Sequence, residues 1–128
     1  ILVVVYLIAV PFVARFVLHP ASYSEQYQVV DRIKQETSEG DQIYIWDSHV
    51  QIYKESQRLA GSMFPSPLLY TNTEENKTSL INDLKENQPK VIVVNDKVAV
   101  WSEVETLLKE NYQPVKTDYS EFKVYKIK

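Results

Sequence analysis

The most constraining feature of the sequence is an unbroken run of β-branched residues at positions 91–94, Val-Ile-Val-Val. A short continuous apolar run of this kind is typical of a strand that is buried on both faces of a sheet. Helical patterns stand on both sides of it, over residues 74–87 and from Ser102 onward. Because strands that alternate with helices favour parallel or mixed sheets covered on both faces, we expect an α/β domain.

The same patterns predict the other elements of this domain. A helix begins near Ser22 and stops before Gly40, a strand covers residues 43–46, and a second helix covers residues 49–58. Ser102 and Glu105 have the spacing of a capping box at the start of the last helix. Residues 59–70 are irregular, with a short strand expected at 68–70, and residues 115–119 and 122–127 form an antiparallel hairpin. We therefore expect a small three-layer domain with a mixed, mainly parallel sheet and a C-terminal antiparallel hairpin, preceded by an apolar helix.

The first 18 residues are apolar on every side and carry one formal charge, Arg15. A membrane-spanning helix needs about 20 mostly apolar residues, so the length alone leaves a buried core strand at residues 2–7 open. Pro11 speaks against a central strand and is better tolerated in a membrane helix. The pattern therefore favours residues 1–20 as the end of a transmembrane helix and residues 21–128 as the domain outside it.

Composition excludes several kinds of catalytic and binding site. The chain has two glycines, no cysteine and two histidines, so a glycine-rich phosphate loop, a thiolate site and a multi-histidine metal centre cannot be built. We expect no metal and no cofactor. The net charge is −3 and no basic stripe is visible, so nucleic acid is not an expected partner.

Polar residues follow two of the predicted strands, where ligands gather in open α/β sheets. Asp47 and His49 follow the first strand, and Asn95-Asp96 follow the second. If the strands are neighbours, Asp47 and Asp96 share a crevice with His49, and a carboxylate beside an imidazole is a usable acid–base pair. Helix capping and turn formation explain the same residues, and the sequence favours that interpretation. We expect no catalytic residue in this chain.

Aromatic residues gather in the middle third of the chain, around Tyr44, Trp46, Tyr53 and Phe64. Tyrosine and tryptophan offer a flat apolar body with a polar tip, which suits an apolar groove for a lipid-linked or sugar ligand. Core packing in a small domain explains the same cluster, and the composition favours it.

The order of the pieces resembles the C-terminal extracytoplasmic domain of bacterial polytopic glycosyltransferases. These enzymes have the C-type fold and are related to the dolichyl-phosphate-mannose protein mannosyltransferases and the aminoarabinose transferases. The resemblance covers nearly the whole chain and rests on an apolar helix followed by YSEQYQVVDRIKQETSEGDQIYIWD, IYKESQRL, NQPKVIVVND and YSEFKVYKIK. The matching residues are Gly40-Asp41, Tyr53, Arg58, Pro89-Lys90, Tyr112, Phe122, Val124 and Tyr125. Ser56-Gln57 departs from the Ser-Gly pair that many relatives have before the arginine.

This resemblance implies a domain on the outer face of the cell membrane, attached to an enzyme that takes its sugar from a polyprenyl-phosphate donor. The acidic catalytic residues of such enzymes lie in loops between membrane helices that this chain lacks. The domain is then non-catalytic, and it covers the active site or aids acceptor recognition. Its partners are the membrane part of its own full-length protein and a lipid-linked sugar or an acceptor glycan or protein. Trp46, Asp47, Tyr53 and Arg58 are the expected ligand or acceptor surface.

Two alternatives stay open at this point. One is a single-pass membrane-anchored binding or adaptor module outside the cytoplasm. The other is a soluble α/β protein in which residues 2–7 form a strand of the core.

Overall fold

The structure is a computed structural model that describes residues 21–128. The predicted end of a transmembrane helix, residues 1–20, lies outside the described residues. The elements follow in the order α2 (Ala21–Glu36), β1 (Gln42–Trp46), α3 (Gln51–Ser56), β2 (Leu59–Ala60), α4 (Glu74–Asn87), β3 (Val91–Asn95), α5 (Ser102–Asn111), β4 (Tyr112–Pro114) and β5 (Phe122–Ile127).

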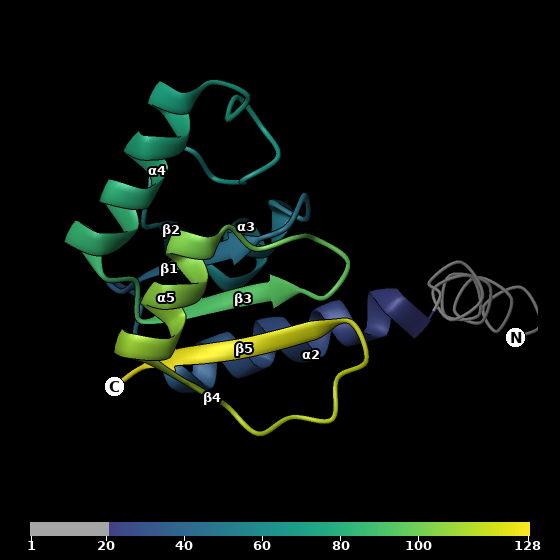
Figure 1. Ribbon diagram of the computed structural model, residues 1–128. Helices are drawn as coiled ribbons and strands as arrows, with labels where there is room; N and C mark the ends of the chain where they lie inside the picture. The colour runs from purple at the N-terminus through teal and green to yellow at the C-terminus, as the bar shows by residue number, and fades with distance from the viewer. Residues whose placement is uncertain (1–20) are drawn as a thin grey trace, which may run out of the picture.

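The strands form one mixed sheet in the order β2-β1-β3-β5-β4. β2, β1 and β3 are parallel, whereas β5 runs antiparallel to both β3 and β4. Helices α2 and α3 pack on one face of the sheet, and α4 and α5 pack on the other (Figure 1). The prediction of a three-layer α/β domain with a mixed sheet is confirmed.

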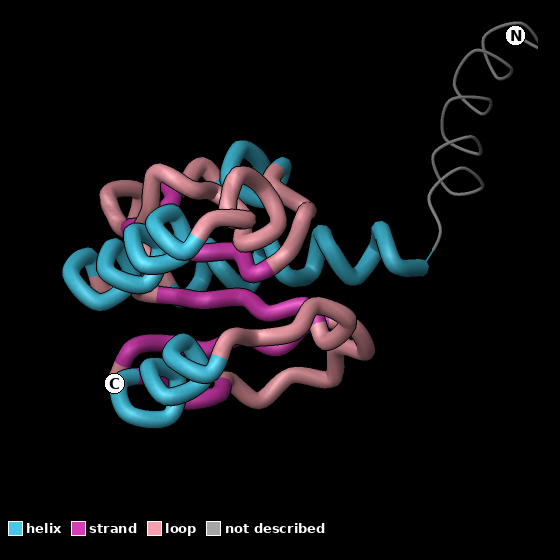
Figure 2. Tube along the Cα trace, turned by 45° about the horizontal axis from the view of Figure 1, so that its top comes forward, coloured by secondary structure: helices cyan, strands magenta, loops and turns pink. Residues whose placement is uncertain are grey.

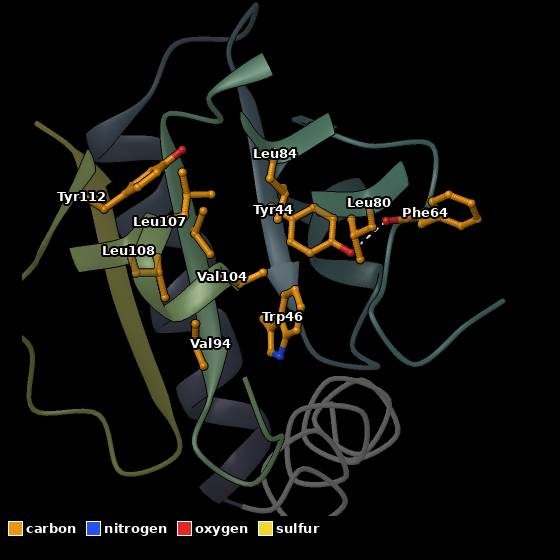
Figure 3. Close-up of a cluster of buried hydrophobic side chains, with 11 residues drawn as sticks. Tyr44, Trp46, Phe64, Leu80, Leu84, Val94, Val104, Leu107, Leu108 and Tyr112 are labelled. Atoms are coloured by element: carbon orange, nitrogen blue, oxygen red, sulfur yellow. Dashed lines mark hydrogen bonds between the residues drawn. The ribbon is translucent and has the colours of Figure 1, made fainter. Parts of the chain in front are cut away.

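Alternation along β1 divides the core into two clusters. Ile43 and Ile45 face α2 and α3, whereas Tyr44 and Trp46 face α4 and α5, and all four side chains are fully buried. Successive side chains of a strand point to opposite faces, so a strand between two helical layers must be apolar at every position. Figure 3 shows the cluster on the α4 and α5 side, with Trp46 at the end of its strand.

Helix α4 matches its prediction over residues 74–87, and local signals explain both of its ends. The side chain of Thr73 accepts a hydrogen bond from the Asn76 amide at 3.2 Å, which caps the first turn. Leu80 and Leu84, four residues apart, are fully buried on the face toward the sheet. Gln88 ends the helix in the left-handed conformation, and its amide donates to the Leu84 carbonyl at 3.2 Å.

The capping box predicted at Ser102 is wrong. Trp101 occupies the N-cap position of α5 and offers no side-chain cap, while the Ser102 hydroxyl donates to Glu103 Oε2 at 3.2 Å. The serine lies one residue inside the helix, where its hydroxyl reaches the neighbouring carboxylate. Val98 and Val100, in the turn before the helix, pack against the same core cluster as Trp101, and this packing sets where the helix begins.

Two strand predictions are also corrected. Residues 68–70 form an exposed loop, and the second parallel strand is the two-residue β2 at Leu59–Ala60. The first strand of the C-terminal hairpin is β4, at Tyr112–Pro114, and residues 115–119 belong to the loop that follows it. Tyr112 accounts for this shift, because its buried ring joins the core and its hydroxyl donates to the Pro89 carbonyl at 2.6 Å.

Candidate functional site

The chain changes direction between β1 and β3. It leaves β1 through α3 to reach β2 on one side, then returns through α4 to β3 on the other side. In open α/β sheets this reversal opens a crevice at the carboxyl ends of the two strands, which is where such folds bind ligands. The loops after β1, β2 and β3 therefore share one edge of the sheet, called here the carboxyl edge.

The start of helix α2 lies at the same edge. The Glu25 carboxylate accepts hydrogen bonds from the Ser120 hydroxyl at 2.7 Å and from the amides of Glu121 and Phe122 at 2.7 and 3.1 Å. Phe122 pairs with Asn95, the last residue of β3. Both views show α2 extending beyond the strands at its N-terminal end (Figure 1, Figure 2).

Glu25 thus ties the β4–β5 loop to α2. Burial acts to raise the pKa of the Glu25 carboxyl, but the hydrogen bonds from the Ser120 hydroxyl and from three backbone amides of residues 120–122 together hold it below its ordinary value. The carboxylate form is therefore the one that fits this loop.

A polar cluster occupies the carboxyl edge between β1 and β3. Asp47 follows β1 and is 3% exposed. Its Oδ1 accepts from the Ser48 amide at 2.7 Å, its Oδ2 accepts from Asn95 Nδ2 at 3.1 Å, and the same Oδ2 contacts Nδ1 of His49. These contacts satisfy a carboxylate that would otherwise be buried without partners.

The contact with Asp47 determines how His49 can act. A carboxylate at Nδ1 keeps the ring proton on that nitrogen, so the neutral imidazole presents Nε2 as a hydrogen-bond acceptor. The ring meets Phe122 edge-on at 6.0 Å between centroids, and its side chain is 39% exposed. His49 can therefore accept a hydrogen bond or a proton from a ligand hydroxyl at this edge.

The structure brings Asp47 and His49 together, as the sequence suggested, but with Asn95 in place of Asp96. Strand β3 extends through Asn95, whose buried side chain reaches Asp47. Asp96 is exposed, and its Oδ1 lies 3.5 Å from Nζ of Lys123. The sequence placed Asn95 directly after a buried strand, and we interpreted it there as a residue that forms a turn.

Trp46, one of the four residues of the expected surface, is fully buried in the cluster on the α4 and α5 side. Its Nε1 donates to the Ala99 carbonyl at 3.0 Å, and its ring meets Trp101 edge-on with centroids 4.9 Å apart. Trp46 therefore holds the loop after β3 against β1 from inside the domain.

Tyr53 and Arg58 also have structural partners. The Tyr53 hydroxyl accepts from the Ile45 amide at 2.9 Å and donates to the Pro65 carbonyl at 2.8 Å, and burial raises its pKa far above the ordinary value. Arg58 is 7% exposed, and its Nε and Nη2 donate to the side chain and carbonyl of Thr37 at 2.8 and 3.2 Å. That these residues take part in recognition stays a prediction, and Asp47 is the member placed beside the exposed His49.

Within residues 21–128, no group of acidic or histidine side chains is arranged to hold a metal ion. In the same part of the chain, no helix combines the length and the apolar character that crossing a membrane requires.

Residues 23–128 match the family model described as "Putative competence-induced protein Ccs4 C-terminal domain". The chain belongs to this family. The match covers the described fold from α2 to β5, so the carboxyl edge and its polar cluster lie within the Ccs4 C-terminal domain. Comparison with curated proteins and with solved structures finds no match.

Proposed function

We propose that this Ccs4 C-terminal domain is the extracytoplasmic domain of a membrane-embedded glycosyltransferase that uses a polyprenyl-phosphate-linked sugar. The reaction takes place in the membrane part of the full-length protein. The domain covers that active site or helps it to recognise the acceptor glycan or protein.

One observation carries this proposal. The apolar residues 1–18 directly precede α2, and α2 begins at the carboxyl edge of the sheet. A membrane anchor at that point turns the carboxyl edge toward the bilayer. The edge with Asp47 and His49 would then face the place where a lipid-linked donor and its acceptor meet.

The family match adds support of a different kind. The matching family is by its description a C-terminal domain, which agrees with a position after the membrane part of a longer protein. The proposed reaction class comes from the resemblance to polytopic glycosyltransferases, and the carboxyl edge is the surface proposed to face the donor and the acceptor.

The test compares membranes that contain the full-length protein with membranes in which residues 21–128 have been deleted. With a radiolabelled polyprenyl-phosphate sugar, we expect the full-length protein to transfer sugar to an acceptor and the deletion to reduce that transfer. The isolated domain should transfer none. Transfer by the isolated domain, or no use of polyprenyl-phosphate donors by the full-length protein, would overturn the proposal.

The length of the parent reading frame separates this proposal from the anchored adaptor. Several hundred residues of hydrophobic segments upstream of Ile1 support the transferase. A start codon shortly before Ile1 supports a single-pass binding module.

A further inference from the structure

A hollow of about 320 Å³ lies between the N-terminal ends of α4 and α5. These helices follow the parallel strands β2 and β3, so their first turns lie at the carboxyl edge. The hollow is separate from the Asp47–His49 cluster, which lies between β1 and β3. Its size suits a single small ring system rather than a long chain.

The floor of the hollow is apolar and rigid. Trp101 and Ile81 line it, and both are partly buried against the core cluster of α4 and α5. The edge-on contact with Trp46, with the two ring planes at 87°, fixes the plane of the Trp101 indole. A half-buried indole held in one orientation offers a flat apolar platform for a ligand.

The rim carries both hydrogen-bond donors and hydrogen-bond acceptors. Nζ of Lys77 lies 5.7 Å from the centroid of the Trp101 ring and 3.6 Å from Glu74 Oε1. On the α5 side, Glu103 lines the hollow and its carboxylate retains a second oxygen beyond the one bound by Ser102. The rim therefore combines carboxylate acceptors with an ammonium donor around one aromatic ring.

We propose that this hollow binds a neutral sugar ring. A pyranose has an apolar face of C–H groups, which can lie on the Trp101 indole, and a rim of hydroxyl groups that donate to Glu74 and Glu103 and accept from Lys77. A purely apolar ligand would leave the charged rim unpaired, and a phosphate would meet two carboxylates of like charge. The flexible Lys77 side chain moves from over the indole to a sugar hydroxyl on binding.

This site deepens the proposed function and rests on it for the source of the sugar, which is the acceptor glycan or the donor held near the membrane. Binding itself can be measured without any transfer reaction. If the hollow binds sugar but the full-length protein transfers none, the transferase proposal fails. If the full-length protein transfers sugar but the hollow binds none, the proposal for the hollow fails.

The experiment titrates the full chain, in a detergent without a sugar headgroup, with methyl glycosides of the common hexoses and N-acetylhexosamines. Binding is followed by saturation-transfer NMR of the sugar and by tryptophan fluorescence. Glu103→Gln removes a rim carboxylate at an exposed position, and Glu110→Gln is the matched control at the other end of α5.

We expect millimolar binding of at least one glycoside, with Glu103→Gln weakening it about tenfold, as for loss of one charge-assisted hydrogen bond, and Glu110→Gln leaving it unchanged. The C–H protons of one sugar face should receive most of the saturation. No saturable response to any glycoside, or equal affinities of the two variants, would overturn the proposal.

Discussion

Replacing Tyr53 with phenylalanine removes one oxygen atom that serves two backbone groups. Ile45 points its amide toward the β2 side of the sheet, because the Gly61 amide donates to Ile43, two residues earlier, at 2.9 Å. Strand β2 has only two residues and ends before it can pair with Ile45. The Tyr53 hydroxyl takes the place of the missing strand partner and also binds the Pro65 carbonyl.

The loss of stability in Tyr53→Phe depends on the two backbone groups that lose their hydrogen-bond partner. Ile45 is fully buried, so its amide loses its partner without gaining water, whereas Pro65 is only partly buried. A buried donor without a partner costs about 1–3 kcal/mol, so with the weaker loss at the carbonyl we expect about 2–3 kcal/mol. For a domain of this size that corresponds to a fall in Tm of roughly 10–20 °C.

Tyr44→Phe is the matched control, because the Tyr44 hydroxyl makes one bond, to the Phe64 carbonyl at 2.8 Å (Figure 3). We expect about 1 kcal/mol for it, since a carbonyl is less costly to leave unpaired than an amide. Urea unfolding of residues 21–128, followed by circular dichroism, measures both variants. If Tyr53→Phe costs no more than Tyr44→Phe, then Tyr53 does not replace a strand partner.

Other substitutions test separate contacts in the structure. Because the pKa of Glu25 is lowered in the folded state, the carboxylate should stabilise the fold above its ordinary pKa of 4.5, and this stabilisation should be lost as the pH falls through the lowered value. The Tm difference between wild type and Glu25→Gln should therefore become smaller in acid. A Tm difference that does not change with pH would contradict this role of Glu25. Asp47→Ala leaves the buried side-chain amide of Asn95 and the Ser48 amide without their acceptor, and thermal unfolding should show a loss of about 2–3 kcal/mol; a neutral effect would contradict this role of Asp47. Gly61→Ala places a Cβ 2.5 Å from Pro89 Cγ and should destabilise by about 1–3 kcal/mol. Gly40→Ala, with nothing within 4 Å and no positive φ, should be neutral or slightly stabilising in the same assay, and equal effects of the two would refute this packing argument.

Strong local patterns were sufficient to predict much of the fold. The apolar run of β3 and the leucine spacing of α4 identified both elements, because burial on two faces and on one stripe leaves different signatures. The two-residue β2 left no such signature, since its Leu59 is exposed and its pairing depends on β1. The hairpin begins earlier than predicted, because Tyr112 both caps the end of α5 and holds the first strand through its hydrogen bond to Pro89.

The candidate site was predicted in part, and the reason is the geometry of parallel strands. The rule that ligands gather at their carboxyl ends was enough to place Asp47 and His49 on one edge. Core packing was the favoured interpretation of the aromatic cluster, and the buried Trp46 agrees with it. The burial of Arg58 could not be predicted, because the sequence does not show which backbone groups lack partners. Arg58 binds Thr37 at the end of α2, 21 residues away, and no local pattern predicts that contact.

The proposed function places the domain outside the cell with its carboxyl edge toward the membrane. Residues 1–128 contain no cysteine, so in a full-length protein from which any other cysteines have been replaced, two single-cysteine variants can report on it: Ser48→Cys at the carboxyl edge and Glu86→Cys near the end of α4, at the opposite edge. In intact cells, each is labelled with a membrane-impermeant fluorescent maleimide, and quenching by a lipid-borne quencher is measured. We expect both positions to be labelled from outside, and the label at position 48 to be quenched more strongly than the one at position 86. Labelling that requires broken cells, or stronger quenching at position 86, would contradict it.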